Sequence, residues 1–113
     1  MSSDATTAGP GSDGTEAFAD GAPLVQLFGG GARARILAVL VDERQRDLSI
    51  SEIARQAGVA RKTVYDHIDE LIDLGAVEVA RETKQSKRYT LAATAVGEKL
   101  YELEGVTLQQ IVQ

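Results

Sequence analysis

Apolar residues recur at helical spacing in three central segments of the chain. The segment 32–42 is apolar around most of its circumference, so we expect a helix that lies in the core. The segment 52–56 is short, and Ile53 and Ala54 are its apolar positions. The segment 61–74 carries a stripe made of Val64, Ile68, Leu71 and Ile72. The pattern therefore predicts three helices packed around one core.

A tight turn is predicted between the second and third of these helices. Gly58 can adopt the left-handed backbone conformation that such a turn requires. We expect Ser51 to cap the second helix, without a capping box, because the residue three positions later is Ala54. Ala60 precedes the third helix and has no side-chain oxygen, and the missing cap costs that helix about 1 kcal/mol.

Period-two alternation replaces the helical spacing after Gly75. Val77 and Val79 point to one side of a first strand, and Tyr89 and Leu91 to one side of a second. The polar segment 82–86 lies between them, which predicts an antiparallel hairpin. Leu48 and Ile50 alternate with Ser49 in the same way, so we also expect a short strand before the second helix.

Shorter apolar segments flank this central unit. The segment 24–28 follows Pro23, which suits a first helical turn, and it ends at three glycines. A fourth helix is predicted over about 95–104, capped by Thr94. The expected organisation has three parts: a disordered acidic and Gly-rich tail (1–23), a folded domain (24–104) and an apolar C-terminal extension (105–113).

Composition limits the classes of protein that fit this pattern. The chain has 113 residues, of which 43% are apolar, so it can bury one modest core. No apolar run reaches the roughly 18 residues of a membrane span, and no secretory signal opens the chain, so we expect a cytoplasmic protein. Because there is no cysteine and only one histidine, we expect no metal and no other cofactor.

The net charge of −5 is unevenly distributed along the chain. Four acidic residues and no basic residue fall within 1–23, which leaves 13 of the 17 acidic residues to face all 12 basic ones. The hairpin is locally basic, with four cations against Glu82: Arg81, Lys84, Lys87 and Arg88. The acidic, Arg-rich composition resembles that of proteins from salt-loving archaea, with an ordinary acidic cytoplasmic protein as the alternative.

Charge also changes sign along the exposed face of the third helix. Arg61, Lys62 and Thr63 occupy its first turn, whereas four carboxylates follow: Asp66, Asp69, Glu70 and Asp73. Phosphates are attracted to helix N-termini and repelled by carboxylates, so only the N-terminal end of this helix suits a groove of DNA.

These features together resemble a winged helix-turn-helix transcriptional regulator of the ArsR and MarR kind, notably the small haloarchaeal versions. The residues that carry the resemblance are Leu27-Phe28-Gly29, the segment 32–40, the two-helix unit around Gly58, and the hairpin. The resemblance covers roughly residues 24–104 and implies a mostly helical α+β fold with the hairpin as a wing. It also implies a homodimer that binds a pseudo-palindromic operator in double-stranded DNA. Ala60 departs from the family, which usually has Ser or Thr there.

The predicted DNA-binding residues come from the first turn of the third helix, from the preceding helix and from the wing. We expect Thr63 to contact the backbone, and Arg61 or Lys62 to reach guanine. The full set is Ser51, Arg61, Lys62, Thr63, Tyr65, Asp66, Arg81, Lys84, Gln85, Ser86, Lys87 and Arg88. The alternatives are that the cations are merely solvated, that Tyr65 packs against the wing, and that Asp66 pairs with Lys62 one turn earlier.

The apolar content of the chain ends exceeds what so small a fold hides, which predicts a dimer interface. Its expected residues are Leu24, Leu27, Phe28, Tyr101, Leu108, Ile111 and Val112. No effector ligand can be inferred from the sequence.

These features bear on three classes of function. A sequence-specific DNA-binding regulator fits them best, and a winged-helix module that binds another protein is the alternative. We do not expect an enzyme, because Gly29–Gly31 lead into Ala-Arg-Ala-Arg rather than a phosphate-binding lysine, and no nucleophile, base and orienting residue can be grouped.

Overall fold

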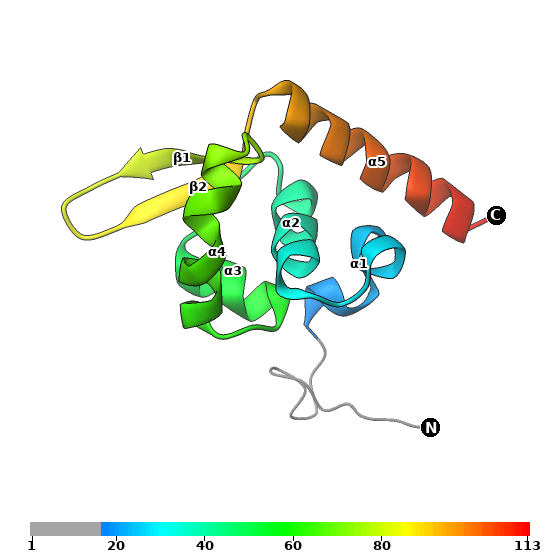
Figure 1. Cartoon of the computed structure of the whole chain (residues 1–113), viewed down its shortest axis with the longest axis horizontal. Coiled ribbons are helices and arrows are strands. Elements are labelled where there is room, and N and C mark those ends of the chain that lie inside the picture. The colour runs from blue at the N-terminus through cyan, green and yellow to red at the C-terminus, as the bar shows by residue number, and fades with distance from the viewer. Residues whose placement is uncertain (1–16) are drawn as a thin grey trace.

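The computed structural model describes residues 17–113 of the chain (Figure 1). Helices dominate these residues, and the two strands form an antiparallel hairpin, as predicted. The elements in order are η1 (Phe18–Gly21), α1 (Pro23–Phe28), α2 (Ala32–Asp42), α3 (Ile50–Ala57), α4 (Arg61–Asp73), β1 (Val77–Glu82), β2 (Lys87–Leu91) and α5 (Ala95–Ile111).

Helix α2 lies at the centre of the fold, which explains why its sequence is apolar on most sides. It packs against α1, α3, α4 and α5, and Ile36 and Leu40 are fully buried. Ile53 from α3 and Val64 from α4 meet it in the same core. The core therefore holds α3 and α4 against one another and leaves their outer faces exposed.

The start of α3 differs from the expectation. Ser49, and not Ser51, is the N-cap, and its hydroxyl accepts a hydrogen bond from the Glu52 N–H at 3.1 Å. The Glu52 carboxylate in turn accepts from the Ser49 N–H at 2.9 Å, so a capping box is present after all. The helix begins at Ile50, which is therefore not part of a strand, and the expected strand is reduced to one bridge between Leu48 and Tyr89.

The turn from α3 to α4 agrees with the sequence. Gly58 adopts the left-handed conformation, with φ of 76°, and its N–H donates to the Ala54 carbonyl. Ala60 is the N-cap of α4 and provides no side-chain hydrogen bond. The first amide groups of α4 therefore lack a side-chain cap.

The hairpin pairs Val77 with Leu91 at its base and Glu82 with Lys87 at its end. Its register shifts between Val79 and Arg81, which is a β-bulge. The bulge brings Arg81 opposite Arg88, so two guanidinium side chains of like charge occupy one cross-strand pair.

Both ends of the folded unit extend further than expected. Ala19, Ala22 and Pro23 are buried against the core, so the folded part already includes residues 17–23, and the tail predicted over 1–23 is wrong for these residues. Residues 1–16 lie outside the described residues. Helix α5 is capped by Thr94 as predicted but continues past Gly105 to Ile111. A single glycine weakens a helix by only about 1 kcal/mol, so Gly105 does not end it.

No helix within residues 17–113 combines the length and the apolar character needed to cross a bilayer.

The cap of α3 gives a stability prediction. Replacing Ser49→Ala removes the hydroxyl acceptor and should lower the free energy of unfolding by about 1 kcal/mol. Ser51→Ala is the matched control two residues away, and it should change stability by less than about 0.5 kcal/mol because its side chain is exposed and does not cap the helix. Urea unfolding measures both, and an equal loss in the two variants would contradict the assigned cap.

Candidate nucleic-acid interface

The N-terminal turn of α4 is exposed and carries two of the predicted cations. Arg61 donates to the Ser51 hydroxyl at 3.4 Å, which links α4 to the start of α3. Lys62 extends into solvent, and its Nζ lies 3.3 Å from the Asp66 carboxylate. The alternative in which Asp66 pairs with Lys62 is therefore confirmed, although this exposed pair leaves the lysine free to exchange partners.

Thr63 and Tyr65 occupy different environments in the same helix. Thr63 is half-buried, and its N–H donates to the Ala60 carbonyl at 3.0 Å. Tyr65 is 60% exposed and faces a cleft between α4 and the hairpin. The cleft has a volume of about 530 Å³ and is bordered by Ser51 and Tyr65 on one side and by the hairpin residues 82–87 on the other.

The tip of the hairpin is a defined turn rather than a loose loop. The Thr83 N–H donates to the Ser86 carbonyl at 2.8 Å, and the Thr83 hydroxyl accepts from the N–H groups of Gln85 and Ser86 at 3.3 and 3.2 Å. Lys84 and Gln85 are exposed at this turn, and Lys84 forms no ion pair with any residue that the structure describes. Lys87 lies 3.9 Å from the Glu82 carboxylate, so its ion pair is weak.

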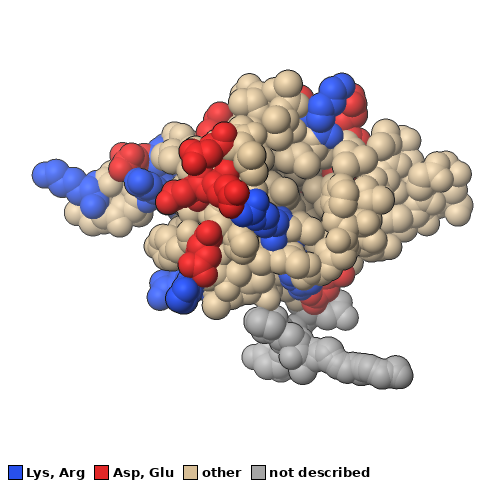
Figure 2. All heavy atoms as spheres, in the orientation of Figure 1, with Lys and Arg blue, Asp and Glu red and all other residues tan. Residues whose placement is uncertain are grey.

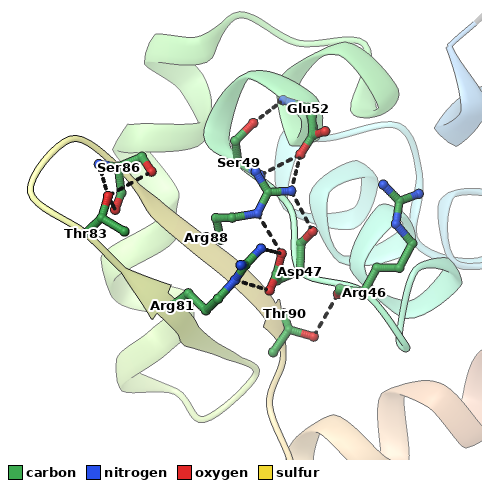
Figure 3. Close-up of polar contacts among 9 residues, drawn as sticks. All are labelled: Arg46, Asp47, Ser49, Glu52, Arg81, Thr83, Ser86, Arg88 and Thr90. Atoms are coloured by element: carbon green, nitrogen blue, oxygen red, sulfur yellow. Dashed lines mark hydrogen bonds and ion pairs between the residues drawn. The ribbon is translucent and has the colours of Figure 1, made fainter.

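Arg81 and Arg88 behave differently from the two lysines, as Figure 3 shows. Both guanidinium groups turn back from the hairpin toward Asp47, in the loop that precedes α3. Arg81 donates to both Asp47 oxygens at 3.0 and 3.2 Å, and Arg88 donates to Oδ1 at 2.6 Å. Arg88 also reaches Glu52 Oε1 at 2.9 Å. Their predicted DNA contacts remain untested, but the structure gives both arginines protein partners instead.

These contacts shift the pKa values of Asp47, Glu52 and Arg88 in the directions that favour their charged forms. The pKa of Asp47 lies below its ordinary value because Arg81 and Arg88 donate hydrogen bonds to the ionised carboxylate. The pKa of Glu52 is also lowered, first by the Ser49 N–H and then by the charge of Arg88. The hydrogen bond to Asp47 raises the pKa of Arg88. At neutral pH Asp47, Glu52 and Arg88 are therefore charged.

Carboxylates cover the rest of α4. Figure 2 shows them as a red band beside the blue cations of the hairpin end, and the members on α4 are Asp66, Asp69, Glu70 and Asp73. Arg33 on α2 lies against this band, where it pairs with Glu70 and donates to His67 Nδ1 at 3.1 Å. His67 is thus a half-buried structural residue that ties α4 to α2.

The predicted dimer residues divide into one that is buried and several that are exposed. Leu24 is only 1% exposed in the monomer core, and its N–H donates to Glu104 on α5, so it cannot belong to a dimer interface. The exposed residues are Leu27 and Phe28 on α1, Tyr101, Leu108 and Ile111 on α5, and Val112 directly after α5. Arg44 stacks on one face of Tyr101, 4.1 Å from the ring centroid.

Sequence reasoning missed the residues that hold the hairpin. Asp47 and Glu52 were not identified as anchors, and Arg88 was assigned by its charge alone. The sequence did contain one usable signal, because Glu52 follows Ser49 by three residues, the spacing of a capping box.

Two comparisons with known proteins agree with this geometry. A family model described as a helix-turn-helix domain matches residues 31–80. The structure of a point mutant of S. aureus MepR bound to an oligodeoxyribonucleotide is similar, with a TM-score of 0.60 and 22% sequence identity over 80% of this chain and 66% of that chain. The chain thus spans about two thirds of that protein. No curated protein matches the sequence. The fold is a winged helix-turn-helix, with the hairpin 77–91 as the wing.

The lowered pKa of Asp47 predicts how stability depends on pH. A carboxyl group whose pKa is lowered by folding stabilises the protein above its unfolded pKa, here an ordinary value of 3.8, and that contribution is lost as the pH falls through the folded value. Asp47→Asn should therefore destabilise the protein near pH 7, and its deficit relative to wild type should shrink below about pH 4.

Unfolding in urea across this range measures the deficit. Asp73→Asn is a suitable control because Asp73 is exposed and forms no ion pair within residues 17–113. A deficit of the Asp47 variant that stays constant from neutral to acidic pH would contradict the assignment.

Proposed function

We propose that the protein is a sequence-specific DNA-binding transcriptional regulator of the ArsR and MarR kind. The observation that supports this most strongly is the placement of exposed cations at the first turn of α4 and at the end of the hairpin. Arg61 and Lys62 occupy the first turn of α4. Lys84 and Lys87 line the cleft between α4 and the hairpin, together with Asp69 and Glu82. The similarity to a DNA-bound winged-helix structure supports the same reading.

Each part of this surface has a proposed role. The first turn of α4 enters the major groove, where Arg61 or Lys62 donates to guanine N7 and O6 and Thr63 contacts the backbone. The uncapped amide groups after Ala60 face a phosphate. Tyr65 contacts a phosphate or a thymine methyl group, and Ser51 supports the Arg61 side chain.

The wing contributes contacts that carry less sequence information. Lys84 and Lys87 neutralise phosphates or reach into the minor groove, and the polar side chains of Gln85 and Ser86 add hydrogen bonds to the backbone. The acidic band on α4 has the opposite effect, because Asp69 and Asp73 repel phosphates. The wing lysines and the acidic band together determine that the N-terminal end of α4 meets the duplex.

We further propose that the protein acts as a homodimer on a pseudo-palindromic operator. Tyr101 and Leu108 are exposed and are spaced by seven residues, which puts them on one face of α5, and the exposed Val112 directly follows the end of this helix. Leu27 and Phe28 on α1 add exposed apolar surface beside this helix, since α1 packs against α5. A two-fold contact here would leave both recognition helices free, with the half-sites about 34 Å apart.

The DNA-binding role is tested by selecting duplexes from genomic fragments and then measuring affinity for the selected site. Arg61→Ala should weaken binding by roughly 5- to 150-fold and relax the preference at one base pair, because a bidentate contact to guanine is worth about 1–3 kcal/mol. Lys99→Ala is the control, since Lys99 lies on α5 and pairs only with Glu102 among the described residues. Should no fragment be preferred while a protein partner is captured, the alternative of a protein-binding module is correct.

The dimer is tested by placing a charge on its proposed apolar face. Leu108→Asp should convert a dimer to a monomer in sedimentation experiments and weaken binding to a two-half-site operator by at least about tenfold, because one half-site is then lost. Gln109→Asp adds the same charge at an exposed neighbouring position and should leave both properties unchanged. A wild-type protein that is monomeric at micromolar concentration, with or without DNA, would rule out the dimer.

A further inference from the structure

We propose that Arg88 is a positioning residue, which locks the wing to the N-terminus of α3 through Asp47 and Glu52. This inference rests on the proposed DNA-binding function and refines it. The wing cations that bind DNA are then Lys84 and Lys87, whereas Arg81 and Arg88 hold the wing in the orientation that these lysines need.

The contacts of Arg88 leave its guanidinium little freedom to bind a phosphate. Its Nε donates to Asp47 Oδ1 at 2.6 Å, and its Nη2 donates to the Asp47 carbonyl at 3.0 Å and to Glu52 Oε1 at 2.9 Å. The side chain is only 29% exposed. Planar guanidinium groups bind carboxylates most strongly in such fixed geometry, so exchanging these partners for one phosphate is unfavourable.

The same Glu52 oxygen also accepts the Ser49 N–H of the capping box, at 2.9 Å. One carboxylate therefore connects the N-cap of α3 with strand β2. A displacement of the wing would disturb both the ion pair and the helix cap, which makes the orientation of the wing depend on the helix-turn-helix unit.

Neighbouring residues of β2 strengthen this attachment. Tyr89 and Leu48 exchange two backbone hydrogen bonds, each of 2.8 Å. The Thr90 hydroxyl donates to the Arg46 carbonyl at 3.1 Å. Three consecutive residues of β2 thus bind the segment before α3, and Arg88 is the one nearest the wing tip (Figure 3).

Asp47 also resolves a repulsion within the hairpin. Arg81 and Arg88 face each other across the two strands, an arrangement that destabilises a sheet when the charges are alike. The Asp47 carboxylate lies between them and accepts hydrogen bonds from both. Without this anion the two arginines would repel each other, and the hairpin would lose its attachment to the loop at the same time.

Asp47→Asn separates positioning from direct binding because the two roles predict opposite signs. If Arg81 and Arg88 bound phosphate, removing their competing carboxylate would free two cations and tighten DNA binding. If they position the wing, the variant should bind DNA about tenfold more weakly, because the wing then adopts its binding orientation only part of the time. Arg88→Met should weaken binding by a similar factor.

A double-mutant cycle provides the second readout. Arg88→Met is combined with the pair Lys84→Ala and Lys87→Ala, and all variants are titrated with the selected operator. If Arg88 acts through the lysines, its loss should change affinity by less than about twofold once both lysines are gone. Effects that multiply in the combined variant would show that Arg88 contacts DNA by itself and would overturn the proposal.

Nitrogen-15 relaxation of the DNA-free protein tests the clamp, meaning the attachment of the wing to α3 through Arg88, Asp47 and Glu52, without relying on the proposed function. Asp47→Asn and Arg88→Met should raise the mobility of the wing-tip amides at 84–86, whereas the lysine variant should leave it unchanged. Tips that stay as rigid as in wild type would overturn the clamp. Increased tip mobility in a protein that binds no duplex would instead confirm the clamp and refute the DNA-binding role.

Discussion

The attachment of the wing to Asp47 is the interaction on which the candidate interface depends. Strands β1 and β2 form a two-stranded hairpin, which has little stability of its own in water. The Leu48–Tyr89 bridge and the ion pairs of Asp47 join it to the loop before α3. Because α3 packs directly against α4, the same loop links the position of the wing to that of the first turn of α4.

The charged residues are distributed unevenly over the surface, and this distribution favours one face for DNA binding. The chain carries a net charge of −5, and a uniform distribution of that charge would repel DNA from every face. Four carboxylates instead occupy the later turns of α4, and others, such as Asp47 and Glu52, pair with arginines. Four cations that Asp47 and Glu52 do not hold lie at the first turn of α4 and at the end of the wing, and they are Arg61, Lys62, Lys84 and Lys87. An acidic protein can therefore present one cationic surface.

Local patterns predicted the elements, while contacts distant in sequence were not predictable. The bounds of α2, the turn at Gly58 and the strands follow from periodicity and backbone preference. The predicted N-cap of α3 was wrong because Ser49 and Ser51 can both cap a helix. The packing of Ile50 in the core makes it the first residue of α3, and this places the cap at Ser49. Arg88 contacts Asp47, which lies 41 positions away in the sequence. Its charge therefore predicted a contact with DNA, whereas its contacts indicate that it holds the wing in place. Leu24 is buried because α1 packs against both α2 and α5.

The most direct test of this account is a map of amide chemical shifts as the protein is titrated with its selected duplex. We expect the perturbed amides to cluster at 61–65 and 84–87, with little change at the acidic end of α4 near Asp73. Perturbations concentrated on the exposed face of α5, with none at the first turn of α4 or the wing tip, would contradict the account.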